Sequence, residues 1–476
     1  MVLKILASAA AYFPSEYTVH AVSALVAILA ARGISQGRKT TRERDLHARV
    51  IILTGGFSPF GLTLLEALAQ RGAHIIALTP HPIDSEVVRT YVELLRATTA
   101  NEQIFAEQCD LASPPSVHAF AARFAKNEDQ RLDAVVFAHE YRHVGVLRFL
   151  ARRTGVGAEE REARERGALA TFLLTTLLLP VMLTAPAERD IRIINVVNRF
   201  HAAAAPSFAT DAAFAFSNAS AQPVISAPHQ SLFLAEGVRA LRAVVVMRHL
   251  QRILDALPSE PPLPKPSSAS TAASVPVVRP GAASQRSNIV AVSVSPGLSR
   301  AETMGPLLGA SAPQSSLAGM IWCASFPLGS VCAEAVGSYA LLYPFLLVFA
   351  KSAAASIQTV LHALFLPTPF KVLSTEDPER TRSAPEELLK PGALYAECAV
   401  VRVQVPSRAP EADDADLAGE TKIPDDGELG GEAMGRRVWE AYEAGLKAWN
   451  AAHPVAPAES DSVGSAGAGI PPAPSI

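Results

Sequence analysis

The sequence predicts an α/β protein with a Rossmann-type, doubly wound parallel sheet in a single domain. Short apolar runs rich in β-branched residues recur along the chain, beginning with residues 50–53, as expected of strands that are buried on both faces. Segments with helical periodicity separate these runs, which is the order of a parallel sheet covered by helices on both sides. A glycine-containing turn, Thr54-Gly55-Gly56, directly follows the first run.

The first strand, helix and second strand are expected within residues 49–80. A helical pattern begins at Gly61 and ends at Arg71-Gly72, and a second apolar run covers residues 74–78. A βαβ unit of about 30 residues is the smallest part of a dinucleotide-binding sheet, and the free amides at the start of its helix attract a pyrophosphate. The segment therefore predicts nucleotide binding, with a βαβ unit that binds no nucleotide as the alternative.

The other expected elements alternate along the rest of the chain. Strands are predicted at 103–111, 132–138, 191–197, 289–294 and 395–405, and helices at 85–97, 114–124, 169–183, 223–257, 351–366 and 436–449.

Composition limits the partners and the compartment. The formal net charge of -3 over 476 residues gives no reason to expect a nucleic acid as partner. The four cysteines fit neither a disulfide framework nor a zinc-binding spacing. These observations favour an intracellular location, and the high apolar content points to an intracellular membrane with the domain on its cytosolic side. The organelle is not readable from the sequence.

Residues 1–32 are predicted to form a membrane anchor. The segment from 17 to 31 carries no formal charge but is shorter than the ~20 residues that cross a bilayer. Basic residues follow the apolar run in the linker 33–48, and this order argues against a signal peptide. The alternative is a helix that packs on the domain.

A second apolar segment, at residues 317–366, is predicted to be a flap that faces lipid. Two uncharged runs within it are separated only by Glu334, and a large exposed apolar surface usually serves a binding partner. A buried lid over a hydrophobic substrate and a re-entrant hairpin are the alternatives.

The remaining boundaries follow from composition. The main domain is expected at 49–405, interrupted by a disordered insertion at 258–287 that is rich in Pro, Ser and Ala. An acidic linker (406–430), a C-terminal helix (431–452) and a disordered tail (453–476) complete the chain.

Over residues 50–405 the chain resembles the short-chain dehydrogenase/reductase family. The resemblance rests on the Thr54-Gly55-Gly56 turn with Gly61, on Asp110-Leu111, on residues 178–182, on Asn195-Val196 and on Ser295-Pro296-Gly297, in that order along the chain. It implies NAD or NADP as cofactor, and Thr79-Pro80-His81 gives no preference between them. By resemblance, the cofactor-binding residues are Thr54, Gly55, Gly56, Ser58, Gly61, Asp110, Leu111, Ala138, Pro296 and Gly297.

The chain departs from the family pattern at the positions that carry the chemistry. Pro59 replaces the middle glycine of the turn and removes an amide donor. The family's catalytic Asn, Ser, Tyr and Lys align with Gly167, Asn198, Glu236 and Ala240, and a shift by one residue would offer Arg239 and Ala235. Neither alignment supplies a phenol. Glu236 could act as a general acid if burial raised its pKa.

His139-Glu140-Tyr141-Arg142-His143 matches the H-E-x-x-H pattern of zinc proteases. That chemistry needs both histidines on one face of a helix and a third ligand. The motif follows a predicted strand, where His and Glu are more often cleft or capping residues, so no metal site is expected.

Two functions remain open. The first is a membrane-associated NAD(P)-binding protein that has lost its catalytic set. The second is an active NAD(P)-dependent oxidoreductase on a lipophilic carbonyl or alcohol, using Glu236, Asn198 or His139. The apolar segment suits a lipophilic small molecule in either case. A homo-oligomer is compatible with the sequence.

Overall fold

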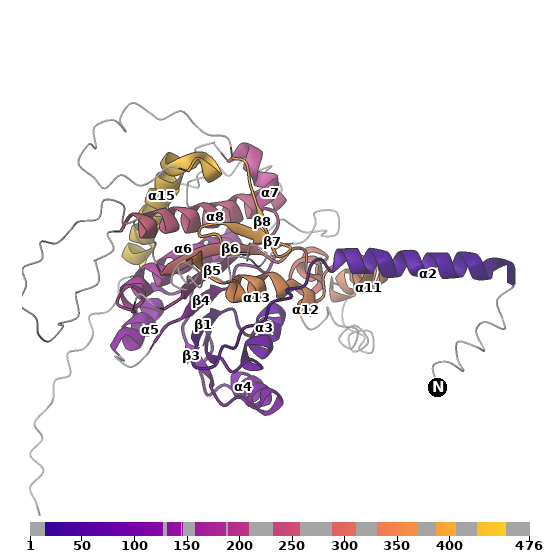
Figure 1. Ribbon diagram of the computed structural model, residues 1–476, viewed down its shortest axis with the longest axis horizontal. Coiled ribbons are helices and arrows are strands. Elements are labelled where there is room, and N and C mark those ends of the chain that lie inside the picture. Colours follow the sequence, from indigo (N-terminus) through magenta and orange to yellow (C-terminus); the bar gives the residue numbers. More distant parts are fainter. Residues whose placement is uncertain are drawn as a thin grey trace, which may run out of the picture.

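An eight-stranded sheet forms the centre of the computed structural model (Figure 1), which describes residues 15–126, 131–143, 145, 158–186, 189–208, 232–257, 288–310, 331–369, 387–405 and 426–453. The strand order is β3-β2-β1-β4-β5-β6-β7-β8, and every neighbouring pair is parallel except β7 and β8. The strands are β1 (Val50–Thr54), β2 (His74–Thr79), β3 (Ile104–Gln108), β4 (Ala134–Phe137), β5 (Ile191–Val196), β6 (Ile289–Ser295), β7 (Leu394–Ala396) and β8 (Ala399–Val401).

The central strands are apolar because neither of their faces meets water. All residues of β1, β4, β5 and β6 are buried. Ile52 of β1 lies opposite Ile76 on one side and Val135 on the other, which sets the register of the three strands. At the edge, β3 is only partly buried, and its sequence is correspondingly more polar.

Two helical layers cover the sheet and confirm the predicted doubly wound fold. One apolar cluster lies between one face and helices α3 (Pro59–Ala69), α4 (Glu86–Thr99) and α13 (Gln358–Phe365). A second cluster lies between the other face and helices α5 (Pro114–Lys126), α6 (Ala158–Leu183), α8 (Leu232–Ala256) and α15 (Gly431–Ala452). Short turns of helix, α7 (His201–Ala204) and α12 (Ala353–Ser356), connect larger elements.

Among the described residues, one helical stretch, Glu162–Leu183 of α6, is long and apolar enough to cross a membrane. Within that stretch, 56% of an apolar segment of 18 residues is buried inside the protein. Its apolar residues therefore belong to the core between the sheet and α15, as in the interior helix of a doubly wound fold.

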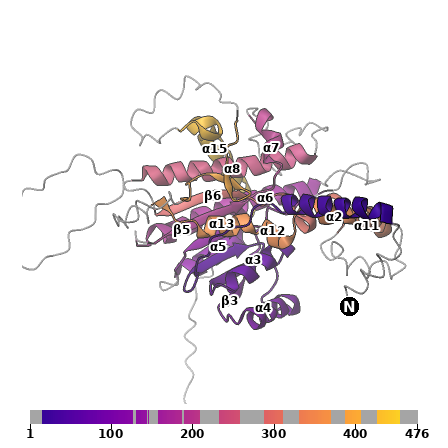
Figure 2. The ribbon, with the colours of Figure 1, turned by 45° about the vertical axis from the view of Figure 1, so that its right-hand side comes forward.

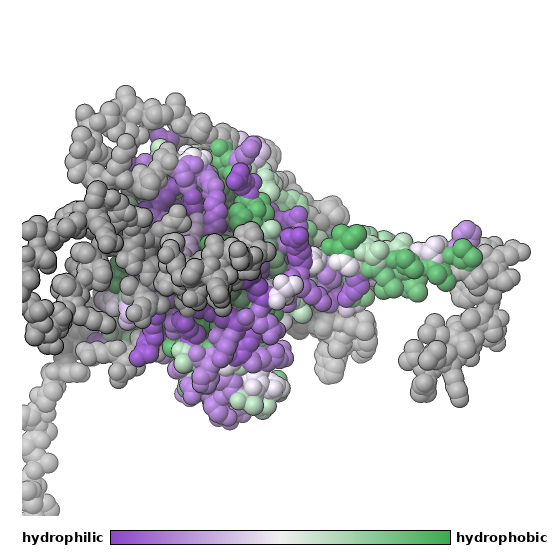
Figure 3. Space-filling model, in the orientation of Figure 1, coloured by the Kyte–Doolittle hydropathy of each residue, from purple (hydrophilic) through white to green (hydrophobic). Residues whose placement is uncertain are grey.

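Two helices project together from one side of the domain. Figures 1 and 2 show α2 (Ser15–Ser35) and α11 (Val331–Phe349) side by side and pointing away from the sheet. Their described side chains include most of the large exposed apolar residues of the protein, which appear as the green extension in Figure 3. The alternative expectation that residues 1–32 pack on the domain is therefore wrong for α2.

Three sequence-based expectations need correction. The strand predicted at 395–405 is instead the hairpin β7–β8, whose turn residues Glu397 and Cys398 have φ of 52° and 56°. The helix predicted at 351–366 is divided into α12 and α13. Both are largely buried, so this half of the predicted flap belongs to the core.

Several predicted segments lie outside the described residues. These are the insertion 258–287, the first part of the flap, most of the acidic linker and the tail beyond residue 453.

Candidate functional site

The predicted phosphate-binding turn lies at the carboxyl end of β1. Gly55 has a φ of 68°, a conformation that favours glycine. A Cβ atom at Gly61 would lie 2.2 Å from the Gly55 carbonyl oxygen, so only glycine permits this close approach of turn and helix. Helix α3 begins at Pro59, two residues before the predicted Gly61, because proline suits the first position of a helix.

The free amides at the start of α3 are already bonded within the protein. Pro59 has no N–H, and the Gly61 N–H donates to the Ser58 hydroxyl at 3.0 Å. The Leu62 N–H donates to the Ser58 carbonyl at 2.8 Å. The Phe60 N–H donates to a carboxylate oxygen of Glu302 at 3.0 Å. The amides that would otherwise bind an anion thus have partners, one of them a carboxylate from a distant segment.

Glu302 comes from a π-helical turn, η3 (Arg300–Met304), that follows β6. The Ser299 hydroxyl caps this turn by accepting from the Glu302 N–H at 2.9 Å. The Glu302 side chain is buried, and burial raises the pKa of its carboxyl above the usual range, although the Phe60 N–H and the Arg142 charge act in the opposite direction. This contact between residues 60 and 302 is not recognisable from the sequence.

His139 covers the glycine turn. Its Nδ1 lies 2.8 Å from the Thr54 hydroxyl, and its Nε2 lies 3.1 Å from the Gly167 carbonyl oxygen. The Ala138 N–H also bonds Thr54, so the loop after β4 is held against the end of β1. Burial lowers the pKa of His139, which favours its neutral form.

The H-E-x-x-H residues do not form a helix. They lie in an irregular turn after β4, and His143 contacts the rings of Phe200 and Phe233 instead of facing His139. The described residues contain no group of three or more His, Cys, Asp or Glu side chains arranged to hold a metal ion. The geometry of the zinc-protease motif is therefore missing here.

A buried network of charges occupies the predicted catalytic position. Arg239 of α8 donates to Glu236 at 2.6 Å and to Glu140 at 2.8 Å. Arg164 of α6 donates to the same Glu236 oxygen at 2.8 Å. The Asn198 amide, just after β5, also donates to that oxygen, at 3.2 Å. The structure thus brings the predicted residues Asn198 and Glu236 into direct contact, but surrounds the carboxylate with donors.

These donors decide the protonation state of Glu236. Burial alone would raise its pKa, but the Arg239 and Arg164 guanidinium groups hold the pKa far below its usual range. The glutamate therefore stays ionised and has no proton to donate near neutral pH. The condition under which Glu236 would serve as a general acid, a pKa raised by burial, is not met, because two adjacent cations outweigh desolvation.

The Pro296-Gly297 turn after β6 is held by a tyrosine and a lysine. The Tyr141 hydroxyl donates to the Gly297 carbonyl at 3.0 Å, and the Lys351 ammonium donates to the Pro296 carbonyl at 2.8 Å. Lys351 also pairs with Glu397 at 2.6 Å. Burial raises the pKa of Tyr141 well above its usual range.

Two other predicted cofactor residues lie apart from this network. Asp110 and Leu111 follow β3, which is separated from β1 by β2. The Asp110 carboxylate accepts from the Ala112 N–H at 2.9 Å within its own turn. Gly56, in contrast, packs inside the glycine turn near Leu65 and Ala77.

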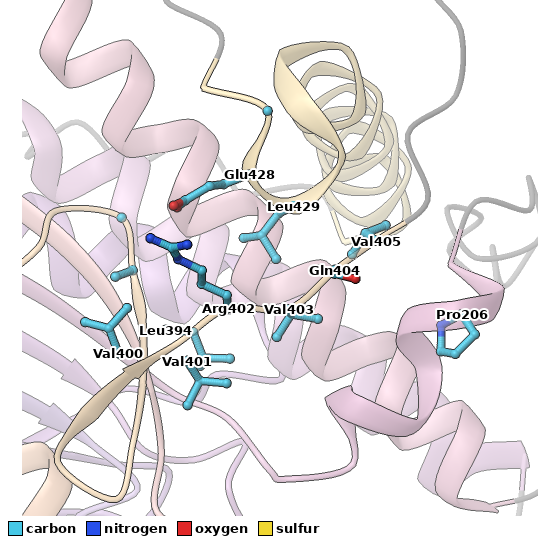
Figure 4. A pocket seen from close by; sticks show the side chains of 13 residues that line it. Pro206, Leu394, Val400, Val401, Arg402, Val403, Gln404, Val405, Glu428 and Leu429 are labelled. Carbon is cyan, nitrogen blue, oxygen red and sulfur yellow. The ribbon is translucent and has the colours of Figure 1, made fainter.

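A cavity lies elsewhere, beside the β7–β8 hairpin (Figure 4). It has a volume of about 650 Å³ and lies between the β7–β8 hairpin and the residues that precede α15. Its lining includes Val400–Val405, Glu428 and Leu429, and none of the predicted site residues. Neither the cofactor prediction nor the catalytic prediction is supported by this cavity.

Comparison with known proteins gives partial matches to oxidoreductases. The chain is 33% identical over 183 residues to an uncharacterized oxidoreductase of Schizosaccharomyces pombe, covering 38% of this chain and 46% of that protein. It is 31% identical over 155 residues to retinol dehydrogenase 13 of Homo sapiens (33% and 43%), and 29% identical over 154 residues to human polyprenol dehydrogenase (32% and 43%). No family model matches the chain.

The chain spans less than half the length of each of these three relatives. Among solved structures, an uncharacterized protein from Mycobacterium paratuberculosis matches 86% of this chain and 98% of its own with a TM-score of 0.41 at 14% identity. The strand order, the glycine turn at the end of β1 and the oxidoreductase relatives agree with one another. Over about a third of its length the chain is similar to oxidoreductases, among them a retinol dehydrogenase and a polyprenol dehydrogenase.

The positions that the alignment assigned to catalysis have contacts that the sequence did not indicate. Position 167 contributes a carbonyl to His139, and position 240 is a buried alanine. Only the shifted alignment offers Arg239, neither alignment includes Arg164, and Glu140 enters the sequence analysis only through the H-E-x-x-H motif. The Glu236–Arg239 spacing of three residues on one helix was the available signal for an ion pair.

Replacing Glu236 by Gln should destabilise the protein by about 3–5 kcal/mol, because two buried guanidinium groups would lose a shared counter-ion. Urea unfolding followed by circular dichroism measures the loss. Glu162→Gln is the matched control: its pair with Arg166 is about one-third exposed and should contribute no more than about 1 kcal/mol. Equal effects of the two substitutions would contradict the network's importance.

His143 makes stability depend on pH. Its ring nitrogens lack partners among the described residues, and burial lowers its pKa from 6.5 to about 4. Since the unfolded chain binds the proton more readily, the contribution of His143 is present above about pH 6.5 and is lost towards pH 4, at about 1.4 kcal/mol per unit. His143→Phe, which keeps the contacts with Phe200 and Phe233, should remove that slope from the unfolding free energy. An unchanged slope would exclude His143 as its source.

Proposed function

We propose that the protein is a membrane-associated member of the short-chain dehydrogenase/reductase family that has lost hydride-transfer catalysis. The contact of Glu236 with Arg239 and Arg164 carries this proposal. An ionised, fully paired carboxylate stands at the position where the family places its proton-donating tyrosine. This carboxylate has no proton to donate to a substrate carbonyl. Arg239 and Arg164 are both paired with it, so neither is available to lower the pKa of a neighbouring group.

The nucleotide site supports the same conclusion. The Glu302 carboxylate takes the Phe60 amide and adds a negative charge at the start of α3, where the family's pyrophosphate would lie. NAD or NADP would have to displace this carboxylate or bind after it is protonated. We therefore propose weak NAD(P) binding that is opposed by the protein's own carboxylate.

Membrane association and a lipophilic partner complete the proposal. The exposed apolar residues of α2 and α11 support a location at a membrane. Two relatives are, by name, a retinol dehydrogenase and a polyprenol dehydrogenase, both of which act on lipophilic alcohols. A lipophilic molecule is thus the ligand class that fits a membrane-bound member of this family.

One observation favours a second function, an active oxidoreductase on a lipophilic alcohol or carbonyl. Tyr141 and Lys351 both bond to the Pro296-Gly297 turn, near which the family places the nicotinamide. Their environment opposes catalysis. The phenol is buried with a raised pKa and donates to a backbone carbonyl, while the ammonium is paired with Glu397.

Replacing Glu302 by Gln should strengthen NADP binding, because the substitution removes the competing negative charge. Thermal unfolding with and without NADP measures this: nucleotide at about 100 times its dissociation constant adds about 2.7 kcal/mol. Glu66→Gln, on the exposed side of the same helix, is the control. In the unmodified protein NADP affinity should also rise as the pH falls towards the raised pKa of Glu302, and this dependence should vanish in Glu302→Gln. Equal affinity of all three proteins would exclude competition by Glu302.

Turnover distinguishes the two functions. The protein with NAD or NADP should show no reduction or oxidation above background on a panel of retinoids, polyprenols, steroids and fatty aldehydes, followed by nicotinamide absorbance. Activity that Tyr141→Phe abolishes would establish the second function. Activity that Glu236→Gln abolishes at a temperature where circular dichroism shows this variant still folded, with Glu162→Gln unaffected, would contradict the proposal that Glu236 takes no part in catalysis.

A further inference from the structure

Helices α2 and α11 come from opposite ends of the sequence but form one projection. Both run towards the domain, so their carboxyl ends meet at its surface (Figures 1 and 2). Apolar residues lie on all sides of both helices, in contrast to the single apolar stripe of a helix that packs on a soluble domain. Their large exposed apolar side chains are Val19, Val22, Leu25, Val26, Ile28, Leu29, Ile34, Leu341, Leu342, Phe345 and Phe349.

Side chains of α2 cap the end of α11. The last carbonyls of a helix have no partner within it. Here the Arg32 guanidinium donates to the Leu347 carbonyl and the Ser35 hydroxyl donates to the Val348 carbonyl. The Gln36 amide, just beyond α2, donates to the Ala350 carbonyl at 3.1 Å. A cation in this position also stabilises the negative end of the α11 dipole. The two helices therefore end together as one unit.

The composition of this unit matches a lipid bilayer rather than another protein. With 21 and 19 residues the helices are about 31 and 28 Å long at ~1.5 Å per residue. The apolar part of α2, Val19–Ser35, is shorter than the ~20 residues that cross a bilayer, so this length suits insertion from one side. The exposed Arg38 and Lys39 lie just after α2, where the pair joins the domain. This is the depth at which basic side chains meet anionic headgroups.

The base of the pair adjoins the segment that follows β6, which includes the Pro296-Gly297 turn. Residue 351, which follows α11, pairs with the segment after β6: the Lys351 N–H donates to the Leu298 carbonyl, and the Arg300 N–H donates to the Lys351 carbonyl, both at 3.0 Å. The Arg300 guanidinium also lies over the Tyr343 ring of α11, 5.5 Å from its centre. The carboxyl edge of the sheet is thus fixed next to the base of the two helices.

We infer that α2 and α11 insert together into a bilayer that contains anionic lipid, as a parallel helix pair that seats the carboxyl edge of the sheet at the membrane surface. The inference rests on the proposed membrane association and specifies which elements enter the lipid. It requires neither nucleotide binding nor turnover. A lipophilic ligand would then reach the site from the bilayer side of the domain.

Tryptophan substitutions at exposed positions test this pair directly. Leu25→Trp reports on α2 and Phe345→Trp on α11, while Leu94→Trp, at an exposed leucine of α4, is the matched control. The full-length proteins are mixed with vesicles of phosphatidylcholine and phosphatidylserine, with and without brominated acyl chains. Relative to the unmodified protein, the added fluorescence of the Leu25 and Phe345 variants should be quenched at least twofold by the brominated chains, and that of the Leu94 variant should not.

The other outcomes distinguish insertion of the helix pair from anchoring by α2 alone, from a dimer and from nonspecific adsorption. Quenching of Leu25→Trp without Phe345→Trp would show that α2 alone is the anchor; the pair would be refuted and membrane association would stand. If neither is quenched, insertion is refuted, and a second copy of the chain covers the helices if sedimentation shows a dimer. Quenching of Leu94→Trp to the same extent would show nonspecific adsorption and also overturn the inference. None of these results depends on NADP binding, so the proposed function is tested separately.

Discussion

The buried Arg239 guanidinium is the constraint on which the rest of the site depends. Removing a charge from water costs several kcal/mol unless oppositely charged partners surround it. Arg239 meets this requirement with Glu236 on its own helix and Glu140 in the loop after β4. Because Arg164 shares Glu236, the arrangement joins α6, α8 and the end of β4 into one assembly. Any substrate entering this position would have to break charge pairs that are largely shielded from water.

The same principle applies at the phosphate-binding turn. The start of helix α3 could bind an anion from outside, but here its Phe60 N–H donates to the carboxylate of Glu302. The close approach of Gly61 to Gly55, typical of a nucleotide-binding turn, is still present. The protein thus retains the backbone geometry of a nucleotide-binding fold while its own side chains neutralise the charges that a ligand would satisfy. The proposed loss of catalysis and the proposed weak cofactor binding would then share one physical origin.

Much of the fold was predictable because the central strands are buried on both faces and therefore consist of uninterrupted apolar runs. The β7–β8 hairpin was missed because its strands are short and its turn uses Glu397 and Cys398 with positive φ, where glycine or asparagine would have been a recognisable signal. Alignment with the family singled out Glu236, but not the ion pairs that surround it. The cations that set its pKa, one of them 72 positions away, can be identified only in three dimensions. The pairing of α2 with α11 was invisible for the same reason.

The ionisation state of Glu236 tests the central claim most directly. Carbon-13 NMR of the glutamate side-chain carboxyl groups, with the Glu236 signal assigned by its loss in Glu236→Gln, follows this carboxylate through a pH titration. The account predicts a signal that keeps the chemical shift of an ionised carboxylate from neutral pH down to the onset of acid unfolding. A carboxyl that takes up a proton near neutral pH in the folded protein would contradict it, since such a group could still serve as an acid.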